Sequence, residues 1–196
     1  AYGFLAELWT ANWGQYLTSA NNGITIAADV TAPTVTSVSS TADNGTYGIG
    51  SVIPITVTFS EPIFVVSTSS SGPMLFLDEV IREMLYSSGS GTNTLQFEYT
   101  VLEGDEDSDL SYASGWSGLR IWQSGSIKDA AGNDADLTLP APGATNSLSA
   151  NKAIVIDGIK PALSSTTPSE NSYVNNTKVS YTLSEAVASG TITWTQ

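Results

Sequence analysis

The stretch Ile53-Pro54-Ile55-Thr56-Val57-Thr58-Phe59 decides the fold of this chain. Apolar residues occupy every second position of it, and two threonines stand between them. Alternation with a period of two is typical of a strand that buries one face. The same pattern recurs at 95–101 and at 179–183, and clusters of Gly, Asn, Asp and Pro separate the apolar runs. Short strands with turns between them predict an all-β β-sandwich.

The segment 74–86 is open to two interpretations. Apolar residues at 77, 81, 84 and 85 have a helical spacing. Met74–Leu77 and Met84–Tyr86 also fit two strands around an acidic turn. The hairpin is the favoured interpretation.

The composition excludes several classes of function. The 196 residues include 19 Asp plus Glu against 6 Lys plus Arg, a net charge of −13, with no His and no Cys. Disulfides, thiolate nucleophiles, zinc fingers and Ser-His-Asp triads are therefore ruled out. So strong a negative charge disfavours nucleic acid and anionic lipid as partners, and no apolar run reaches the ~18 residues of a membrane span. The remaining hard oxygen ligands suit calcium.

The chain contains an internal repeat. Asp29 precedes Pro33 by 4 residues, and Asp157 precedes Pro161 by the same spacing. Each Pro is followed by a strand pattern and then by Ser-Glu, with Glu61 in the first copy and Glu185 in the second. The two Asp residues are 128 positions apart. A repeat of this length predicts tandem modules, each of which contacts its neighbours along a rod.

The repeat also predicts domain boundaries. Residues 29–157 are expected to form one complete module. Residues 1–28 are interpreted as the terminal strands of a preceding module, and residues 158–196 as the first strands of a following, truncated one. Half a core is unstable alone, so both end segments are expected to pair with further sequence of the polypeptide or with an adjacent chain. The second possibility would make the chain a subunit of a head-to-tail extracellular filament.

Four motifs resemble the bacterial immunoglobulin-like repeats of large surface adhesins and biofilm-associated proteins. They are Asp-x-Thr-Ala-Pro at 29–33, Phe-Ser-Glu-Pro at 59–62, Ser-Gly-Ser-Gly-Thr-Asn-Thr-Leu at 88–95 and Lys-Asp-Ala-Ala-Gly-Asn at 128–133. The resemblance covers most of 29–187. It implies immunoglobulin-like Greek-key β-sandwich modules in series, at the bacterial cell surface, stiffened by calcium at their junctions. The partners would be neighbouring immunoglobulin-like modules of the same polypeptide or of adjacent chains.

An immunoglobulin-like strand order would bring three acidic segments to one end of the module. The start of the first strand, the B–C loop and the F–G loop converge there in such folds. Calcium takes about 6–8 oxygen ligands, largely from carboxylates and backbone carbonyls. The expected ligands at this end are Asp29, Glu61, Asp129, Asn133 and Asp134.

A second calcium site is expected at the opposite end, where 103–109 carries five carboxylates. Its expected ligands are Glu103, Asp105, Asp107 and Asp157, with Glu185 contributed by the next module. The run is not an EF-hand loop, because its sixth position is Leu110 and its twelfth is Trp116. At both ends the alternative is that the acids are solvated or only shape turns.

A carbohydrate-binding β-sandwich is the rival function. The five Trp residues could stack on sugar rings, although packing in the core is the commoner role of such residues. Trp116, in the loop 114–118, is the best candidate for contact with a glycan or another cell-surface ligand. No enzymatic activity is expected, because no pair of carboxylates stands out as a glycosidase pair and no Gly-rich loop with Lys is present.

Overall fold

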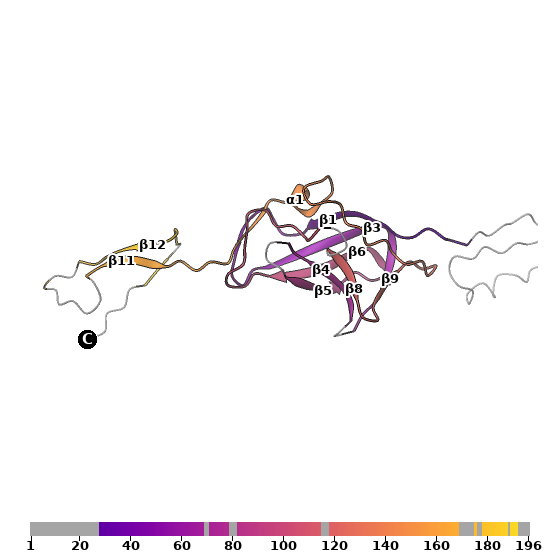
Figure 1. Ribbon diagram of the computed structural model, residues 1–196, viewed down its shortest axis with the longest axis horizontal. Coiled ribbons are helices and arrows are strands. Elements are labelled where there is room, and N and C mark those ends of the chain that lie inside the picture. Colours follow the sequence, from indigo (N-terminus) through magenta and orange to yellow (C-terminus); the bar gives the residue numbers. More distant parts are fainter. Residues whose placement is uncertain are drawn as a thin grey trace, which may run out of the picture. The chain divides into compact units, whose positions relative to one another are not determined.

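The computed structural model describes residues 28–68, 71–78, 82–114, 118–168, 175, 178–187 and 189–191 (Figure 1). The expectations for 1–27 and for Trp116 lie outside these residues. The chain divides into two compact units, Ala1–Gly158 and Ile159–Gln196, and each is described by itself.

The first unit is built on a curled, antiparallel main sheet. In spatial order its strands are β1 (Val35–Ser40), β3 (Val52–Val66), β6 (Thr92–Thr100), β5 (Glu83–Ser88), β4 (Gly72–Phe76) and β8 (Leu119–Trp122), and β9 (Ser126–Lys128) pairs with β3. The strands predicted at 53–59 and 95–101 are confirmed. Their alternate apolar residues are almost completely buried: Ile53, Ile55, Val57, Phe59, Leu95, Phe97, Tyr99 and Val101. The predicted all-β class is therefore correct.

The ambiguous segment 74–86 is a hairpin, as favoured from the sequence. β4 and β5 pair in antiparallel register, with Met74 opposite Leu85 and Leu75 opposite Met84. Leu75 and Met84 are buried, whereas Leu85 is exposed. The helical spacing is coincidental, because Met84 is buried in β5, Leu85 of the same strand is exposed and Leu77 lies beyond the end of β4.

A smaller sheet contains β2 (Gly45–Gly48), β10 (Ile154–Asp157) and β7 (Glu106–Asp107). β10 runs parallel to β2 and antiparallel to β7. A short helix, α1 (Leu148–Asn151), precedes β10, and the Ser147 hydroxyl caps it by accepting a bond from Ala150 N–H. Among the described residues no helix is long and apolar enough to cross a bilayer.

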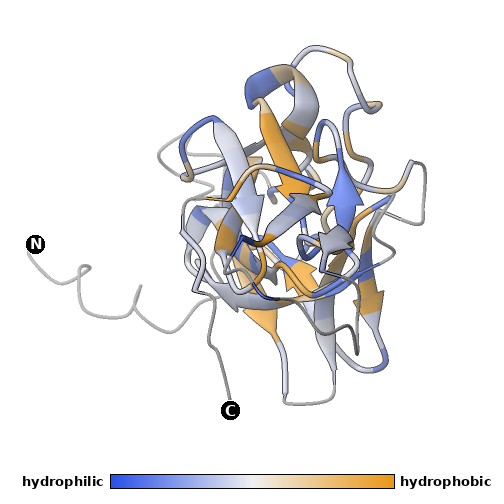
Figure 2. Cartoon of the chain, turned by 90° about the vertical axis from the view of Figure 1, so that its left-hand side faces the viewer, coloured by the Kyte–Doolittle hydropathy of each residue, from blue (hydrophilic) through white to orange (hydrophobic). Residues whose placement is uncertain are grey.

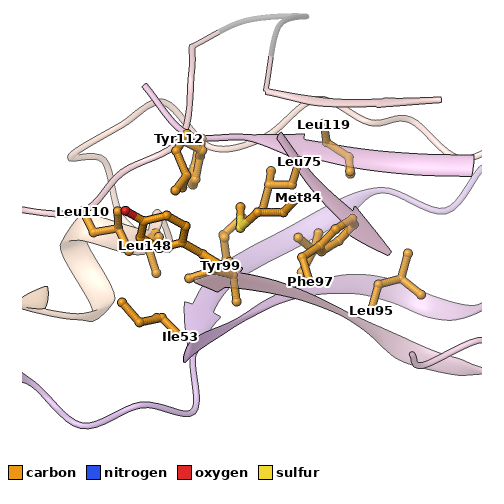
Figure 3. Close-up of a cluster of buried hydrophobic side chains, with 14 of the residues drawn as sticks. Ile53, Leu75, Met84, Leu95, Phe97, Tyr99, Leu110, Tyr112, Leu119 and Leu148 are labelled. Carbon is orange, nitrogen blue, oxygen red and sulfur yellow. The ribbon is translucent and has the colours of Figure 1, made fainter. Parts of the chain in front are cut away.

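One hydrophobic core joins the two sheets and the helix. Figure 3 shows side chains from several strands and Leu148 from α1 converging on one another. Ile154 and Ile156 of the smaller sheet belong to the same buried cluster as Ile53 and Phe97 of the main sheet. Burying each such side chain contributes about 1.5–3 kcal/mol. Strongly hydrophobic segments in Figure 2 include several of the strands, and two apolar sheet faces sharing one core are consistent with a β-sandwich.

β3 changes partner halfway along its length. It pairs with β6 as far as Ile63, with a register shift between Thr58 and Ile63, and with β9 from Phe64 onward. Pro62 falls in this interval, where its lack of an N–H removes a ladder donor. Ser60 N–H donates to the carbonyl of Thr34, and its hydroxyl accepts from Thr34 N–H. The irregular centre of β3 is thus fixed beside the segment that leads into β1.

The second unit contains the hairpin of β11 (Leu163–Thr167) and β12 (Ser180–Leu183), with Leu163 opposite Leu183. β12 confirms the strand predicted at 179–183. The expectation that its apolar face is half-buried is wrong for the described residues, because Tyr181 is 46% exposed and Leu163 is 64% exposed. A two-stranded hairpin offers no second layer that could cover that face.

Candidate metal centre

Three of the predicted ligands converge in the first unit. Asp29, Glu61 and Asp129 each have a carboxylate oxygen within 4.8 Å of the others. Asp29 precedes β1, Glu61 lies in the irregular centre of β3, and Asp129 follows β9. Asp29 is exposed, Glu61 is half-buried and Asp129 is buried. We call these three residues the linker cluster.

The turn after β9 orients Asp129. Asn133 donates its backbone N–H to Oδ1 of Asp129 at 2.8 Å and its side-chain Nδ2 to Oδ2 at 2.7 Å. Burial by itself raises the pKa of Asp129, but the bonds from Asn133, together with backbone bonds from Gly132 and Ala131, outweigh it. The net pKa lies below the ordinary value, so the carboxylate stays ionised at neutral pH.

Asn133 also holds the linker in place. Its Nδ2 lies 3.2 Å from the carbonyl oxygens of both Asp29 and Thr31. Asp29 in turn accepts the N–H of Thr31 at 3.0 Å, which bends the chain locally. Asn133, predicted as a metal ligand, therefore clamps the linker backbone to the loop after β9.

Glu61 is the member of the cluster that is least compensated. Its pKa is raised, first by burial and then by the charges of Asp29 and Asp129. Among the described residues, no Lys or Arg forms an ion pair with any of the three carboxylates. Three converging acids without a protein cation form a set that a divalent ion could neutralise.

Asp134 does not join the linker cluster. It forms an ion pair with Lys128, and its side chain is 78% exposed. Lys128 also donates to the carbonyl of Gly132. The antiparallel bridge between Lys128 and Asp134 explains this ion pair, and the role of Asp134 as a metal ligand stays a prediction.

Asp105, expected in the second site, is an internal structural residue. It is 3% exposed, and Oδ1 accepts from Nε and Nη2 of Arg82 at 3.1 and 2.7 Å. Oδ2 accepts from the Tyr99 hydroxyl at 2.8 Å and from Leu102 N–H at 2.9 Å. Burial raises the pKa of Asp105, but these bonds lower it further. Protein donors already satisfy both oxygens, so the expected metal-ligand role of Asp105 does not fit its surroundings.

The other residues of the second predicted site are not assembled within the first unit alone. Glu103 is exposed, Asp107 is buried in β7, and Asp157 ends β10 opposite Glu106. Glu185 belongs to the second unit, and its grouping with Asp157 stays a prediction. The C-terminal end of β10 is tightly held, because the Gly158 N–H donates to the carbonyl of Asp105 at 2.7 Å and the Gly158 carbonyl accepts from the Gly104 N–H at 2.9 Å.

No family model, curated protein or solved structure matches the chain.

Proposed function

We propose that this chain is an extracellular structural and adhesive repeat module of a large bacterial cell-surface protein. In this proposal its β-sandwich has the immunoglobulin-like Greek-key order, and calcium bound by Asp29, Glu61 and Asp129 stiffens the junction with the preceding module. The convergence of the three carboxylates within 4.8 Å is the observation that carries the proposal. The order of sequence motifs and the repeat of the Asp-to-Pro spacing support it.

The mechanism is mechanical. Asp29 lies in the segment that enters the module, whereas Glu61 and Asp129 belong to its body. An ion that binds all three would attach the linker to the body and restrict bending there. It would also neutralise the repulsion that raises the pKa of Glu61. Backbone carbonyls and water would complete the about 6–8 oxygen ligands that calcium requires.

Thermal unfolding with calcium and with chelator tests the proposal. A ligand of the folded state at 100 times its Kd stabilises by roughly 2.7 kcal/mol, so calcium should raise the Tm clearly. Asp29→Asn should reduce that gain, because it deletes one charged ligand, while its amide oxygen can still accept the N–H of Thr31 and so preserve the local turn. Asp43→Asn is the matched control, because Asp43 is exposed and lies outside the cluster.

Two outcomes would contradict this function. The full chain could have the same Tm in calcium and in chelator, and the same maximum dimension in small-angle scattering. Alternatively, Asp29→Asn and Asp43→Asn could respond to calcium equally.

A carbohydrate-binding function is the second candidate. Trp122 of β8 is 50% exposed and lines a hollow of about 450 Å³. Tyr86, Gln123 and several hydroxyl groups line the same hollow. An exposed indole beside polar groups is a suitable platform for a sugar ring. A glycan array with the wild type and Trp122→Ala would support this candidate only if binding is seen and the substitution abolishes it.

A further inference from the structure

A hollow of about 490 Å³ lies outside the linker cluster, and all six residues that line it carry acidic or hydroxyl side chains. It is lined by Asp78, Glu106, Asp107, Ser108, Asp109 and Ser111. None of these residues belongs to the linker cluster, and Asp105, the satisfied carboxylate of the same loop, is not among them.

Backbone hydrogen bonds fix the two chain segments that line the hollow, the residues around Asp107 and the residue Asp78. Asp107 lies in β7, where it is paired with Ile156 of β10. Asp78 follows β4, and its N–H donates to the carbonyl of Ser111 at 3.3 Å. Leu77 and Tyr112 form an antiparallel bridge immediately beside this bond. Asp78 is therefore brought to the loop by chain pairing.

Asp107 is the residue that points to a ligand. It is only 8% exposed, and its Oδ1 accepts the N–H of Asp109 at 2.9 Å. A backbone hydrogen bond from Ser111 also reaches this carboxylate, while its Oδ2 is buried without a partner of good hydrogen-bond geometry among the described residues. The hydroxyl oxygen of Ser111, which lines the same hollow, is also buried without a partner. Buried polar atoms are nearly always paired, so two unsatisfied oxygens in one hollow require an explanation.

The charges favour a cation. Four of the six lining residues are carboxylic acids, and none is basic. Arg82, the basic residue just before β5, is bonded to Asp105 instead. The protein thus supplies this hollow with anionic oxygens but with no compensating charge from its lining.

We propose that this hollow is an intramodular calcium site, with Asp107 as its buried ligand, Asp78 and Asp109 as outer carboxylates and Ser111 as a hydroxyl ligand. Asp107 ends β7, and Asp109 and Ser111 follow in the bend after it, where the Asp109 N–H already folds back onto the Asp107 carboxylate. A hard divalent cation suits carboxylate and hydroxyl oxygens of this kind. The loop is not an EF-hand, because the sixth position counted from Asp107 is Tyr112 instead of Gly. The ion would fasten the connection after β4 to the loop after β7.

Calcium titration followed by amide NMR tests this site separately from the linker cluster. The titration uses the full chain carrying Asp29→Asn and Glu61→Gln, so that the linker cluster is disabled. Calcium should shift the amides of 78 and 106–112 while those of 130–134 stay in place. If the amides of 78 and 106–112 do not move at millimolar calcium, or respond to magnesium in preference to calcium, the proposal is overturned.

Two variants identify the ligands. Asp107→Asn in the same background should weaken calcium binding by at least about tenfold, since even the loss of an outer-shell partner typically costs that much. Ser111→Ala removes one neutral ligand and should weaken binding by a smaller factor, and it serves if Asp107→Asn fails to fold. Asp43→Asn is the control and should bind as the parent does. Binding unchanged by Ser111→Ala and by any folded Asp107→Asn would overturn the assignment.

Discussion

Asp105 and Glu61 of the linker cluster are both carboxylates, but Asp105 is surrounded by hydrogen-bond donors and Glu61 by other acids. Asp105 receives bonds from Arg82, Tyr99 and Leu102, and its pKa falls. Glu61 faces two further acids, and its pKa rises. A carboxylate with protein donors stabilises the fold directly. A group of carboxylates without a cation destabilises the fold by mutual repulsion until an ion binds. The density of acids along the chain does not distinguish the two cases, but their partners do.

The largest expected effect comes from removing the satisfied carboxylate. Asp105→Ala leaves the Tyr99 hydroxyl and Leu102 N–H without their acceptor. We expect a loss of about 3 kcal/mol in the free energy of unfolding, measured by urea denaturation. Asp43→Ala should change it by less than about 0.5 kcal/mol. Equal effects of the two substitutions would remove the distinction between the two acidic regions.

Gly158→Ala should be the next most harmful change. A Cβ at Gly158 would lie 2.3 Å from the carbonyl oxygen of Leu102 and 2.7 Å from that of Asp105. Both are backbone atoms that cannot swing away, so a loss of about 1–3 kcal/mol is expected. Gly132→Ala is an informative contrast: its Cβ meets nothing, and only its φ of +96° is strained. Denaturation that ranks Gly132→Ala as clearly the worse change would show that close approach is not what position 158 requires.

The effect of Glu61→Gln on the stability of the fold should have opposite signs without and with calcium. Without the ion the substitution removes repulsion from Asp29 and Asp129, and it should stabilise by about 0.5–1 kcal/mol. With calcium it removes a ligand and should destabilise. Calorimetric melting of the wild type and the variant, each with calcium and with chelator, measures both signs. A variant that is less stable in both conditions would indicate that Glu61 is a structural residue like Asp105.

The smallest effect is a dependence of stability on pH. A carboxyl group whose folded pKa is raised contributes stability below its unfolded pKa, and that contribution is lost as the pH rises through the folded pKa. Glu61 should therefore make the calcium-free protein slightly less stable as the pH rises above about 4.3, the ordinary value for Glu. Asp105 acts in the opposite sense, and its contribution is lost only as the pH falls through its lowered folded pKa. Between pH 4 and 7 the free energy of unfolding of the calcium-free protein should fall less in Glu61→Gln than in the wild type. An identical dependence on pH in the two proteins would contradict repulsion of Glu61 by Asp29 and Asp129.

The sequence predicted what local pattern determines. Period-two alternation located β3 and β6 because burial of one strand face leaves a direct record in the residue types. The convergence of Asp29, Glu61 and Asp129 was expected from the immunoglobulin-like resemblance, and their carboxylates do lie together. Residues before β1, in the bulge of β3 and after β9 meet because β1 and β9 both pair with β3.

The rest depended on contacts between distant segments. The pairing of Arg82 with Asp105 joins the connection before β5 to the loop before β7, and no spacing in the sequence reveals it. Asp78 reaches Ser111 only because Leu77 and Tyr112 form a bridge. The alternation of Asp107, Asp109 and Ser111 was a usable signal for a cation loop, but which acids are satisfied depends on tertiary partners.

Calcium in the linker cluster is the central claim, and a crystal structure grown with calcium tests it most directly. We expect anomalous density between the carboxylates of Asp29, Glu61 and Asp129, with oxygen distances of about 2.3–2.6 Å. At saturating calcium, density for water alone there, or a Lys or Arg side chain inserted among the three acids, would contradict the claim.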